Sequence, residues 1–264
     1  MLYRTMKFTK LFRNILAVAM ATVILTACDD DDSDYWYPGG GYYYANALVT
    51  AKTADDGAFF LQLTDDKTLL PANYKKSPYE KEVRALVNYT KIPENEYFNY
   101  LPDGKLTGYD ALVKINWIDS ILTKKPVPNL LEKNDETYGV DCVEMVDDWV
   151  TIAEDGYLTL RFRTRWGGGN RLHRVNLITG VNDENPYEVE FRHDAQGDVN
   201  GAWGDALVAF DINSLPDTEG KTVKLKLRWK SYSGEKSVEF DFCSRKATGG
   251  EIPTENLMSA RLLN

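Results

Sequence analysis

Apolar and polar residues alternate along most of the chain between Asn46 and Lys246, and this period-two pattern constrains the fold more than any other feature. It is clearest over residues 223–230, which read Val-Lys-Leu-Lys-Leu-Arg-Trp-Lys, and it recurs over residues 157–166. A strand with one packed and one solvated face is typical of antiparallel sheets. Helical periodicity is weak and confined to Pro93–Leu101. The chain is therefore predicted to be all-β.

The first block of alternation, residues 46–125, predicts a small OB-like β-barrel domain. Its five expected strands are residues 46–53, 59–63, 68–70, 83–89 and 113–117. Five half-buried strands in so short a block suit a partly closed barrel, an architecture that often binds oligosaccharides on one face. Alternation places Trp117 with Val113 and Ile115 on the core side, so the tyrosines of Tyr97-Phe98-Asn99-Tyr100 remain as the expected aromatic platform for a ligand.

The segment Pro126-Val127-Pro128-Asn129 interrupts the pattern and predicts a hinge between two domains, because proline cannot donate to a strand ladder and extends the residue before it. The second block, residues 136–248, predicts an antiparallel β-sandwich domain. Its seven expected strands lie around residues 149–151 and over residues 157–166, 171–178, 187–193, 206–212, 222–229 and 237–243.

Residues 1–27 are predicted to be a signal peptide. A basic start without acidic residues precedes an apolar run over residues 15–25, whose helical length is far below the roughly 30 Å core of a bilayer. The run ends in Leu25-Thr26-Ala27-Cys28, which resembles the lipobox of bacterial lipoproteins. We expect cleavage before Cys28 and attachment of lipid, such as palmitate, to its sulfur, so that Cys28 binds the chain to membrane lipid. The alternative is an ordinary secreted protein with a chance cysteine.

Residues 28–45 are expected to form an unstructured tether. Asp29–Asp34 carries five carboxylates in six residues, which repel one another and stay solvated. Tyr35–Tyr44 is a low-complexity aromatic and glycine segment. An acidic stretch directly after the lipidated cysteine resembles the export signal that sends lipoproteins of some Gram-negative anaerobes to the outer face of the outer membrane. The expected location is the outer membrane, facing the cell exterior, and a mere spacer is the alternative.

The acidic composition excludes one class of partner. The chain has a formal charge of −9, and removal of the four leader cations takes the mature part to −13. Such a surface is repelled by phosphate backbones, so we expect no nucleic-acid partner. Beyond Cys28 only Cys142 and Cys243 remain, too few for a disulfide framework or a CxxC metal site. An oxidising compartment allows a bridge between them, but their strand patterns favour two separate thiols.

Few residues suggest chemistry. His173 and His193 share the parity of apolar neighbours, so they form either a metal or acid–base pair or, as we favour, two histidines at the edge of the core. Trp166–Asn170 is glycine-rich but lacks the lysine and helix of a phosphate loop, so it predicts a hairpin loop. Asp194–Asp205 is rich in oxygen ligands without EF-hand spacing, which leaves hydrated carboxylates or weak calcium binding.

Basic residues recur on the polar faces of two expected strands. They are Lys224, Lys226, Arg228 and Lys230 in one strand and Arg161, Arg163 and Arg165 in another. Together they could form a basic sheet face for an anionic polysaccharide or an acidic partner. The alternative that we favour is a solvated sheet surface whose cations pair with Glu and Asp on neighbouring strands.

Several segments together resemble the NigD-like lipoproteins. They are Asp155-Gly156-Tyr157-Leu158, the strand that contains His173, Tyr187–Asp194, Gly197-Asp198 and Ala209–Pro216. The resemblance covers nearly the whole mature chain and implies an N-terminal OB-type domain and a C-terminal β-sandwich behind a lipoprotein leader. The family takes its name from a bacteriocin gene cluster, and its members have no settled activity.

We expect a membrane-anchored, surface-exposed lipoprotein that acts as a non-catalytic binding or interaction module with a protein or glycan partner. No catalytic, cofactor-binding or metal-binding residue is predicted, because no nucleophile or third ligand has matching spacing. Two alternatives remain. The resemblance suggests a bacteriocin-associated immunity or protective lipoprotein, and the residues allow a hydrolase that uses His193 with Asp194 or Glu190.

Overall fold

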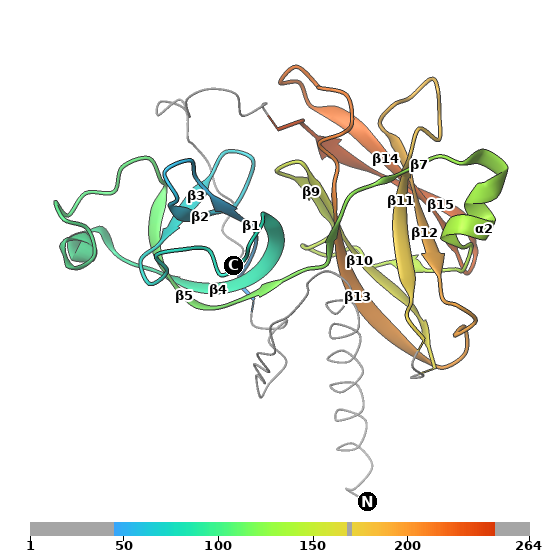
Figure 1. The fold of residues 1–264 in the computed structure, drawn as a ribbon, viewed down its shortest axis with the longest axis horizontal. Helices are drawn as coiled ribbons and strands as arrows, with labels where there is room; N and C mark the ends of the chain where they lie inside the picture. Colours follow the sequence, from blue (N-terminus) through green and yellow to red (C-terminus); the bar gives the residue numbers. More distant parts are fainter. Residues whose placement is uncertain (1–44, 168–170, 246–264) are drawn as a thin grey trace, which may run out of the picture. The chain divides into compact units, whose positions relative to one another are not determined.

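The computed structural model describes residues 45–167 and 171–245. The predicted signal peptide, Cys28, nearly all of the acidic tether and part of the glycine-rich loop lie outside the described residues. The described chain divides between Ile121 and Leu122 into two compact units, each of which is described by itself (Figure 1). Both units are built almost entirely of strands, as the alternation predicts. Within the described residues, no helix is both long and apolar enough to cross a bilayer.

Residues 45–121 form a closed five-stranded barrel with the strand order β1-β2-β3-β5-β4. The strands are β1 (Ala47–Thr53), β2 (Phe59–Gln62), β3 (Thr68–Pro71), β4 (Val83–Lys91) and β5 (Ala111–Ser120). Only β3 and β5 pair in parallel. The interior is filled by apolar side chains that alternate along the strands, among them Val49, Phe59, Leu61, Leu69, Ala85, Val87, Val113 and Ile115. The predicted OB-like barrel is confirmed.

The prediction that Trp117 lies with the barrel core is wrong, because a β-bulge reverses the alternation in β5. Asn88 pairs with Trp117 and Tyr89 pairs with Ile115, so Asn116 is an extra residue on β5. After the bulge, Ile118 packs against the core cluster and Trp117 does not belong to it. A single extra residue moves every later side chain to the other face of a strand.

Residues 122–244 form two sheets. The first sheet contains β6 (Thr123–Lys124), β13 (Ala202–Asp211), β10 (Tyr157–Trp166) and β8 (Glu144–Met145) in that order, and β9 (Ile152–Glu154) also pairs with β10. The second sheet has the order β15 (Gly234–Phe242), β14 (Val223–Ser231), β12 (Glu188–Asp194), β11 (Arg174–Thr179) and β7 (Val127–Pro128). Most pairs are antiparallel, but β12 and β14 are parallel, since the chain crosses to the first sheet through β13 between them.

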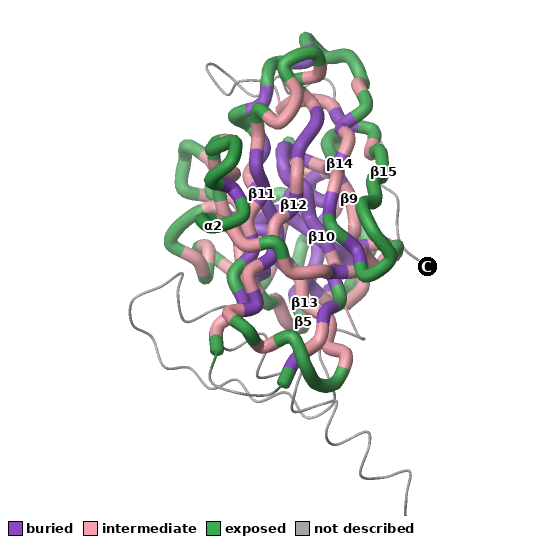
Figure 2. Tube along the Cα trace, turned by 90° about the vertical axis from the view of Figure 1, so that its right-hand side faces the viewer, coloured by how far each residue is buried: buried purple, intermediate pink, exposed green. Residues whose placement is uncertain are grey.

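The inner faces of the two sheets share one apolar core, which confirms the predicted sandwich (Figure 2). Leu158, Leu160, Phe162, Val208 and Phe210 come from the first sheet, and Leu177, Val189, Phe191, Leu225 and Leu227 come from the second. The rings of Phe162 and Phe191 meet across the interface with centroids 5.3 Å apart. Burying each such side chain contributes roughly 1.5–3 kcal/mol of transfer free energy.

The proline segment, which predicts a hinge, is instead part of the sandwich. Thr123–Lys124 adds β6 beside β13, and Val127–Pro128 adds β7 beside β11, each in parallel. Proline is tolerated in β7 because this strand lies at the sheet edge. Lys124 also ties the sheets together, since its Nζ donates to the Val175 carbonyl and to Asn176 Oδ1 in the opposite sheet. Burial lowers the pKa of this amine.

The remaining elements are short. Residues Glu94–Asn99 form the 3-10 helix η2 within the predicted helical stretch, Leu131–Lys133 forms η3, and Asn134–Tyr138 forms α2. Asp155-Gly156 makes a two-residue hairpin turn between β9 and β10, with φ of 51° and 72° respectively. Positive φ at both central residues is typical of the type I′ turn, which Asp-Gly favours.

Candidate functional site

The two histidines are buried and touch each other at the edge of the sandwich core. His173 precedes β11 and His193 lies in β12, and 2.9 Å separates His173 Nδ1 from His193 Nε2. The ring of Trp166 stacks on His173 with a centroid distance of 4.2 Å and an interplanar angle of 19°. His173 Nε2 lies 3.5 Å from Asp198 Oδ2. The predicted apolar orientation of both histidines is therefore confirmed, and their direct contact is new.

Burial keeps this pair neutral at pH 7. Burial and then the neighbouring His173 lower the pKa of His193 to about 4. Burial also lowers the pKa of His173, although the Asp198 carboxylate opposes that shift. The two ring nitrogens that face each other share a hydrogen bond. Among the described residues, no group of three His, Cys, Asp or Glu side chains is arranged to hold a metal ion.

The structure does not bring together the residues of the hydrolase alternative. His193 points into the core, whereas the neighbouring carboxylates of β12 lie on its other face. Glu190 binds Arg192 and Arg228 there. Asp194 Oδ1 accepts a hydrogen bond from the Gln196 backbone N–H at 2.8 Å.

The carboxylates of residues 194–205, a stretch that runs from the end of β12 into β13, have separate partners. Asp198 Oδ1 accepts from the Gly167 N–H at 2.8 Å. Asp205 binds Arg161 and Arg163 of β10. Burial tends to raise the pKa of Asp205, but the hydrogen bonds from these arginines outweigh it and the pKa is lowered. The oxygen atoms point in different directions, so the geometry gives the calcium interpretation no support.

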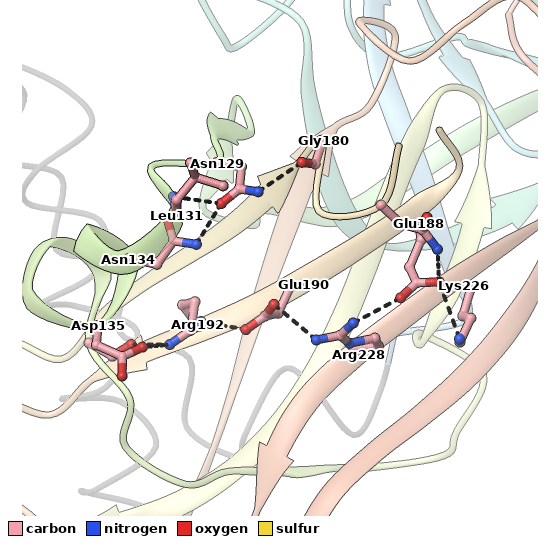
Figure 3. A network of polar contacts seen from close by, with 12 residues as sticks. Asn129, Leu131, Asn134, Asp135, Gly180, Glu188, Glu190, Arg192, Lys226 and Arg228 are labelled. Atoms are coloured by element: carbon pink, nitrogen blue, oxygen red, sulfur yellow. Dashed lines mark hydrogen bonds and ion pairs between the residues drawn. The ribbon is translucent and has the colours of Figure 1, made fainter. Parts of the chain in front are cut away.

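The two basic stripes do not form one basic face. Arg161, Arg163 and Arg165 lie in β10 of the first sheet, whereas the lysine-rich stripe lies in β14 of the second. Figure 3 shows acidic neighbours paired with Lys226 and Arg228, two members of the stripe of β14. Carboxylates and cations alternate there along one chain of contacts, which runs Lys226, Glu188, Arg228, Glu190, Arg192, Asp135. The favoured interpretation, a solvated sheet surface with cross-strand ion pairs, describes this face.

Cys142 and Cys243 are both free thiols and both partly buried. The structure therefore agrees with the favoured prediction of two separate thiols. No bridge fixes Cys243, which follows β15, to Cys142, which precedes β8.

The most exposed aromatic residues of the barrel project from the loop between β4 and β5. Phe98 is 70% exposed and Tyr100 is 48% exposed. The loop is internally bonded, since the N–H groups of Tyr100 and Leu101 both donate to the Tyr97 carbonyl, at 2.9 Å and 2.8 Å. The Gly104 N–H donates to the Leu101 carbonyl at 3.1 Å, and a Cβ added at Gly104, where φ is 68°, would lie 3.3 Å from Phe98 Cβ. We call Tyr97–Tyr100 the aromatic tip.

Two carboxylates directly precede the aromatic tip. Glu94 and Glu96 occupy the first turn of η2. Such a surface can stack against an apolar face of a ligand and accept hydrogen bonds from hydroxyl or amide groups around it. The sequence identified the tyrosines here, but Phe98 is the residue that protrudes furthest. In an OB-type barrel the β4–β5 loop flanks the usual binding face.

An open groove on the sandwich contains an aromatic residue that the sequence analysis missed. It has a volume of about 460 Å³ and is lined by Glu144, Met145, Val146, Asp147, Arg163 and Trp203. The Arg165 guanidinium lies 4.1 Å from the centre of the Trp203 ring, and the Tyr232 ring meets Trp203 edge-on with centroids 5.0 Å apart. These contacts make Trp203 a fixed wall of the groove. It escaped notice because the predicted strand began only at residue 206.

Comparison with known protein families is consistent with the two units. Residues 48–121 match the family described as the NigD-like N-terminal OB domain. Residues 125–242 match the family described as the NigD-like C-terminal beta sandwich domain. Among curated proteins, none matches the chain.

Solved structures from related bacteria share this architecture. A protein from Parabacteroides distasonis described as toxin related is 33% identical, with a TM-score of 0.61, and the match covers 75% of this chain and 92% of that one. A protein of unknown function from Bacteroides vulgatus is 19% identical, with a TM-score of 0.57 and coverage of 80% and 96%. A NigD-like immunity protein from Bacteroides caccae is 21% identical, with a TM-score of 0.50 and coverage of 76% and 91%. The last two similarities show the fold alone.

Proposed function

Because the chain belongs to the NigD-like family, we propose that it is a membrane-tethered lipoprotein that acts as a non-catalytic binding module. The single observation that carries this proposal is the aromatic tip. Its partner is a glycan or protein outside the cell. No settled activity of the family decides between these two, so the proposal rests on the residues of this chain.

The aromatic tip contributes little to folding and therefore suits recognition. Phe98 leaves 70% of its surface in water, so removing it forfeits almost no buried area. The surrounding loop is nevertheless ordered by backbone hydrogen bonds and by Gly104. Ordering a loop costs about 1–2 kcal/mol per residue. A fixed loop that presents rings to solvent is typical of a binding element.

We expect Phe98→Ala to reduce partner binding at least tenfold while changing the free energy of unfolding by less than about 0.5 kcal/mol. The mature protein, in detergent micelles, would be applied to an array of envelope polysaccharides and of surface proteins from neighbouring bacteria. Leu131→Ala is the matched control, because Leu131 is 74% exposed in the other unit. Equal binding by wild type and Phe98→Ala, or no binding beyond empty micelles, would remove the aromatic tip as the binding element.

The tether is the second part of the proposal. Cys28 lies outside the described residues, and its lipid attachment rests on the lipobox-like Leu25-Thr26-Ala27-Cys28. We propose that the acidic stretch after Cys28 directs the protein to the outer membrane, facing the cell exterior. Labelling with palmitate should mark the wild type and not Cys28→Ser, and Cys28→Ser should leave the membrane fraction. Protease added to intact cells should then cleave the wild type. An unlabelled wild type would contradict the tether.

An immunity role is the second candidate. It is favoured by the description of the 33% identical Parabacteroides distasonis structure as a toxin-related protein. Deletion of the gene should then raise sensitivity to bacteriocins of neighbouring strains, and Phe98→Ala should fail to restore protection. Unchanged sensitivity after deletion would dismiss this candidate and leave the binding proposal standing.

A further inference from the structure

The outer edge of β15 is a long row of backbone groups with which no described strand pairs. β15 is nine residues long, is the terminal strand of its sheet, and pairs with β14 from Gly234 to Phe242. An antiparallel partner bonds the backbone of every second residue, so the others direct N–H and C=O groups outward. Within the described ranges, no further strand pairs with β15. Such an edge is a template for an added strand.

The side chains of β15 are exposed along most of its length. Every residue from Gly234 to Glu239 is exposed, whereas β14 beside it alternates buried and accessible positions. Figure 2 shows the contrast, with β15 mostly green beside the partly purple β14. The residues of β15 from Gly234 to Glu239 are therefore open to solvent, whereas Phe240 and Phe242 pack toward the core.

Charge alternates from strand to strand across the outer face of this sheet. The acidic row of β12 is Glu188 and Glu190, the basic row of β14 is Lys224, Lys226, Arg228 and Lys230, and the acidic row of β15 is Glu235, Glu239 and Asp241. Lys226 stands in register with Glu188 on one side and with Glu239 on the other. A strand beyond β15 would face the acidic row, and opposite charges stabilise such cross-strand pairs.

The inward face of β15 offers apolar surface between Lys236, which forms an ion pair, and Phe242, which is buried. Val238 is 38% exposed, and Phe240 is only partly buried against the core. At the turn end, Lys236 Nζ lies 2.8 Å from Glu144 Oε2 of β8 and holds the two sheets together. At the other end Phe242 is buried. Because β8 has only two residues, it leaves Val238 accessible to an added strand.

We propose that β15 binds an extended cationic peptide segment in which Lys or Arg alternates with apolar residues. The backbone of the segment would pair with the free edge of β15. Its cations would face Glu235, Glu239 and Asp241, and its apolar side chains would lie beside Val238 and Phe240. This inference goes beyond the proposed function and does not depend on the aromatic tip.

A second copy of the chain fits this edge poorly. Two β15 strands placed edge to edge would bring two acidic rows together, and like charges on neighbouring strands are destabilising. The same charges protect the protein from edge-to-edge aggregation. The charge pattern therefore favours a basic partner segment over self-association.

The test uses a fluorescein-labelled nine-residue peptide that alternates Lys and Val, titrated with the full mature protein and followed by fluorescence anisotropy. Two further peptides carry N-methyl groups on alternate residues, one on the odd positions and one on the even positions. Strand pairing directs only one set of N–H groups toward β15. We expect one methylated peptide to bind roughly tenfold more weakly and the other to bind like the parent. Equal affinity of both methylated peptides, or no binding of the parent, would overturn the proposal.

Charge reversal supplies an independent readout. The double variant Glu235→Lys/Glu239→Lys should lose at least tenfold in affinity for the Lys–Val peptide and should gain affinity for a Glu–Val peptide. Both positions are exposed, and near-ultraviolet circular dichroism would check that the variant is folded. Unchanged preference would overturn the proposal. Phe98→Ala should retain peptide binding, so failure of this inference and failure of the aromatic tip are distinguishable.

Discussion

Lowering the pH from 7 to 5 is expected to reduce the free energy of unfolding of the sandwich by about 2 kcal/mol through His193 alone. The folded pKa of His193 is about 4, below its ordinary value of 6.5. The unfolded chain therefore binds more protons between these values, and stability rises with pH. The contribution is complete above about pH 6.5 and is lost as the pH falls toward 4. His173 acts in the same direction.

Urea unfolding at pH 7 and pH 5, followed by the fluorescence of Trp166 and the other tryptophans of the sandwich, measures this loss. Buried carboxylates with lowered pKa values, such as Asp205, stabilise the fold less only when the pH falls below their pKa in the unfolded chain, which is near 4. The difference between pH 7 and pH 5 therefore reports on the histidines. His193→Gln replaces the imidazole with an amide of similar length, which can form hydrogen bonds but does not titrate. It should show a clearly smaller difference between the two pH values. An equal difference in both proteins would contradict the assignment.

Gly139→Ala is expected to destabilise the sandwich by about 3 kcal/mol or more. Gly139 ends α2 with φ of 82°, and an added Cβ would lie 2.5 Å from the His193 carbonyl oxygen and 2.5 Å from Asp194 Cβ. Two of the three nearest contacts, to the His193 carbonyl oxygen and to Asp194 Cα at 2.6 Å, are to the backbone of β12, which cannot move there without disturbing its pairing with β11. The cost therefore exceeds that of the left-handed conformation itself.

Gly180→Ala is the matched control for this substitution. Gly180 has φ of 72° in the same unit, but nothing lies within 4 Å of its added Cβ. It should cost only about 1 kcal/mol, the price of a non-glycine residue at positive φ. Thermal and urea unfolding of both variants would give the two values. An equal loss of unfolding free energy in the two variants would show that the backbone of β12 shifts to accommodate the added methyl group.

Strands that alternate cleanly and lie inside a sheet were predictable from the chain alone. The expected strand over residues 157–166 coincides with β10, because its sequence alternates apolar Leu158, Leu160 and Phe162 with polar Thr159, Arg161 and Arg163. The same parity placed His173 and His193 on the packed side. It could not show that the two rings touch, since the register between β11 and β12 is set by long-range pairing.

Features that depend on one residue or on a distant partner were not predictable. The bulge at Asn116 reverses the parity of Trp117 and leaves no local signal. β6 and β7 have two residues each, too few to show any period, so the prolines at positions 126 and 128 suggested a hinge. The basic residues of β10 and β14 could have formed one basic face, an interpretation that the sequence did not favour, and the topology places them in different sheets.

The candidate binding surfaces were also predictable only in part. The sequence identified the tyrosines of the aromatic tip by composition, but the exposure of Phe98 follows from the loop that holds it. Trp203 and the acidic row of β15 became visible only when the neighbouring strands were known. Each of these surfaces combines residues whose significance depends on what lies beside them.

The course of residues 122–128 determines where the chain can be cut. Within this stretch, β6 pairs with β13 of one sheet and β7 pairs with β11 of the other. Lys124 of β6 also donates a hydrogen bond to the Val175 carbonyl of β11. A fragment that starts at Asn129 would lack β6 and β7 and would leave the edges of β13 and β11 unpaired. A fragment that starts at Leu122 would keep both edges paired. Any attempt to obtain the C-terminal half by itself should therefore begin upstream of the prolines.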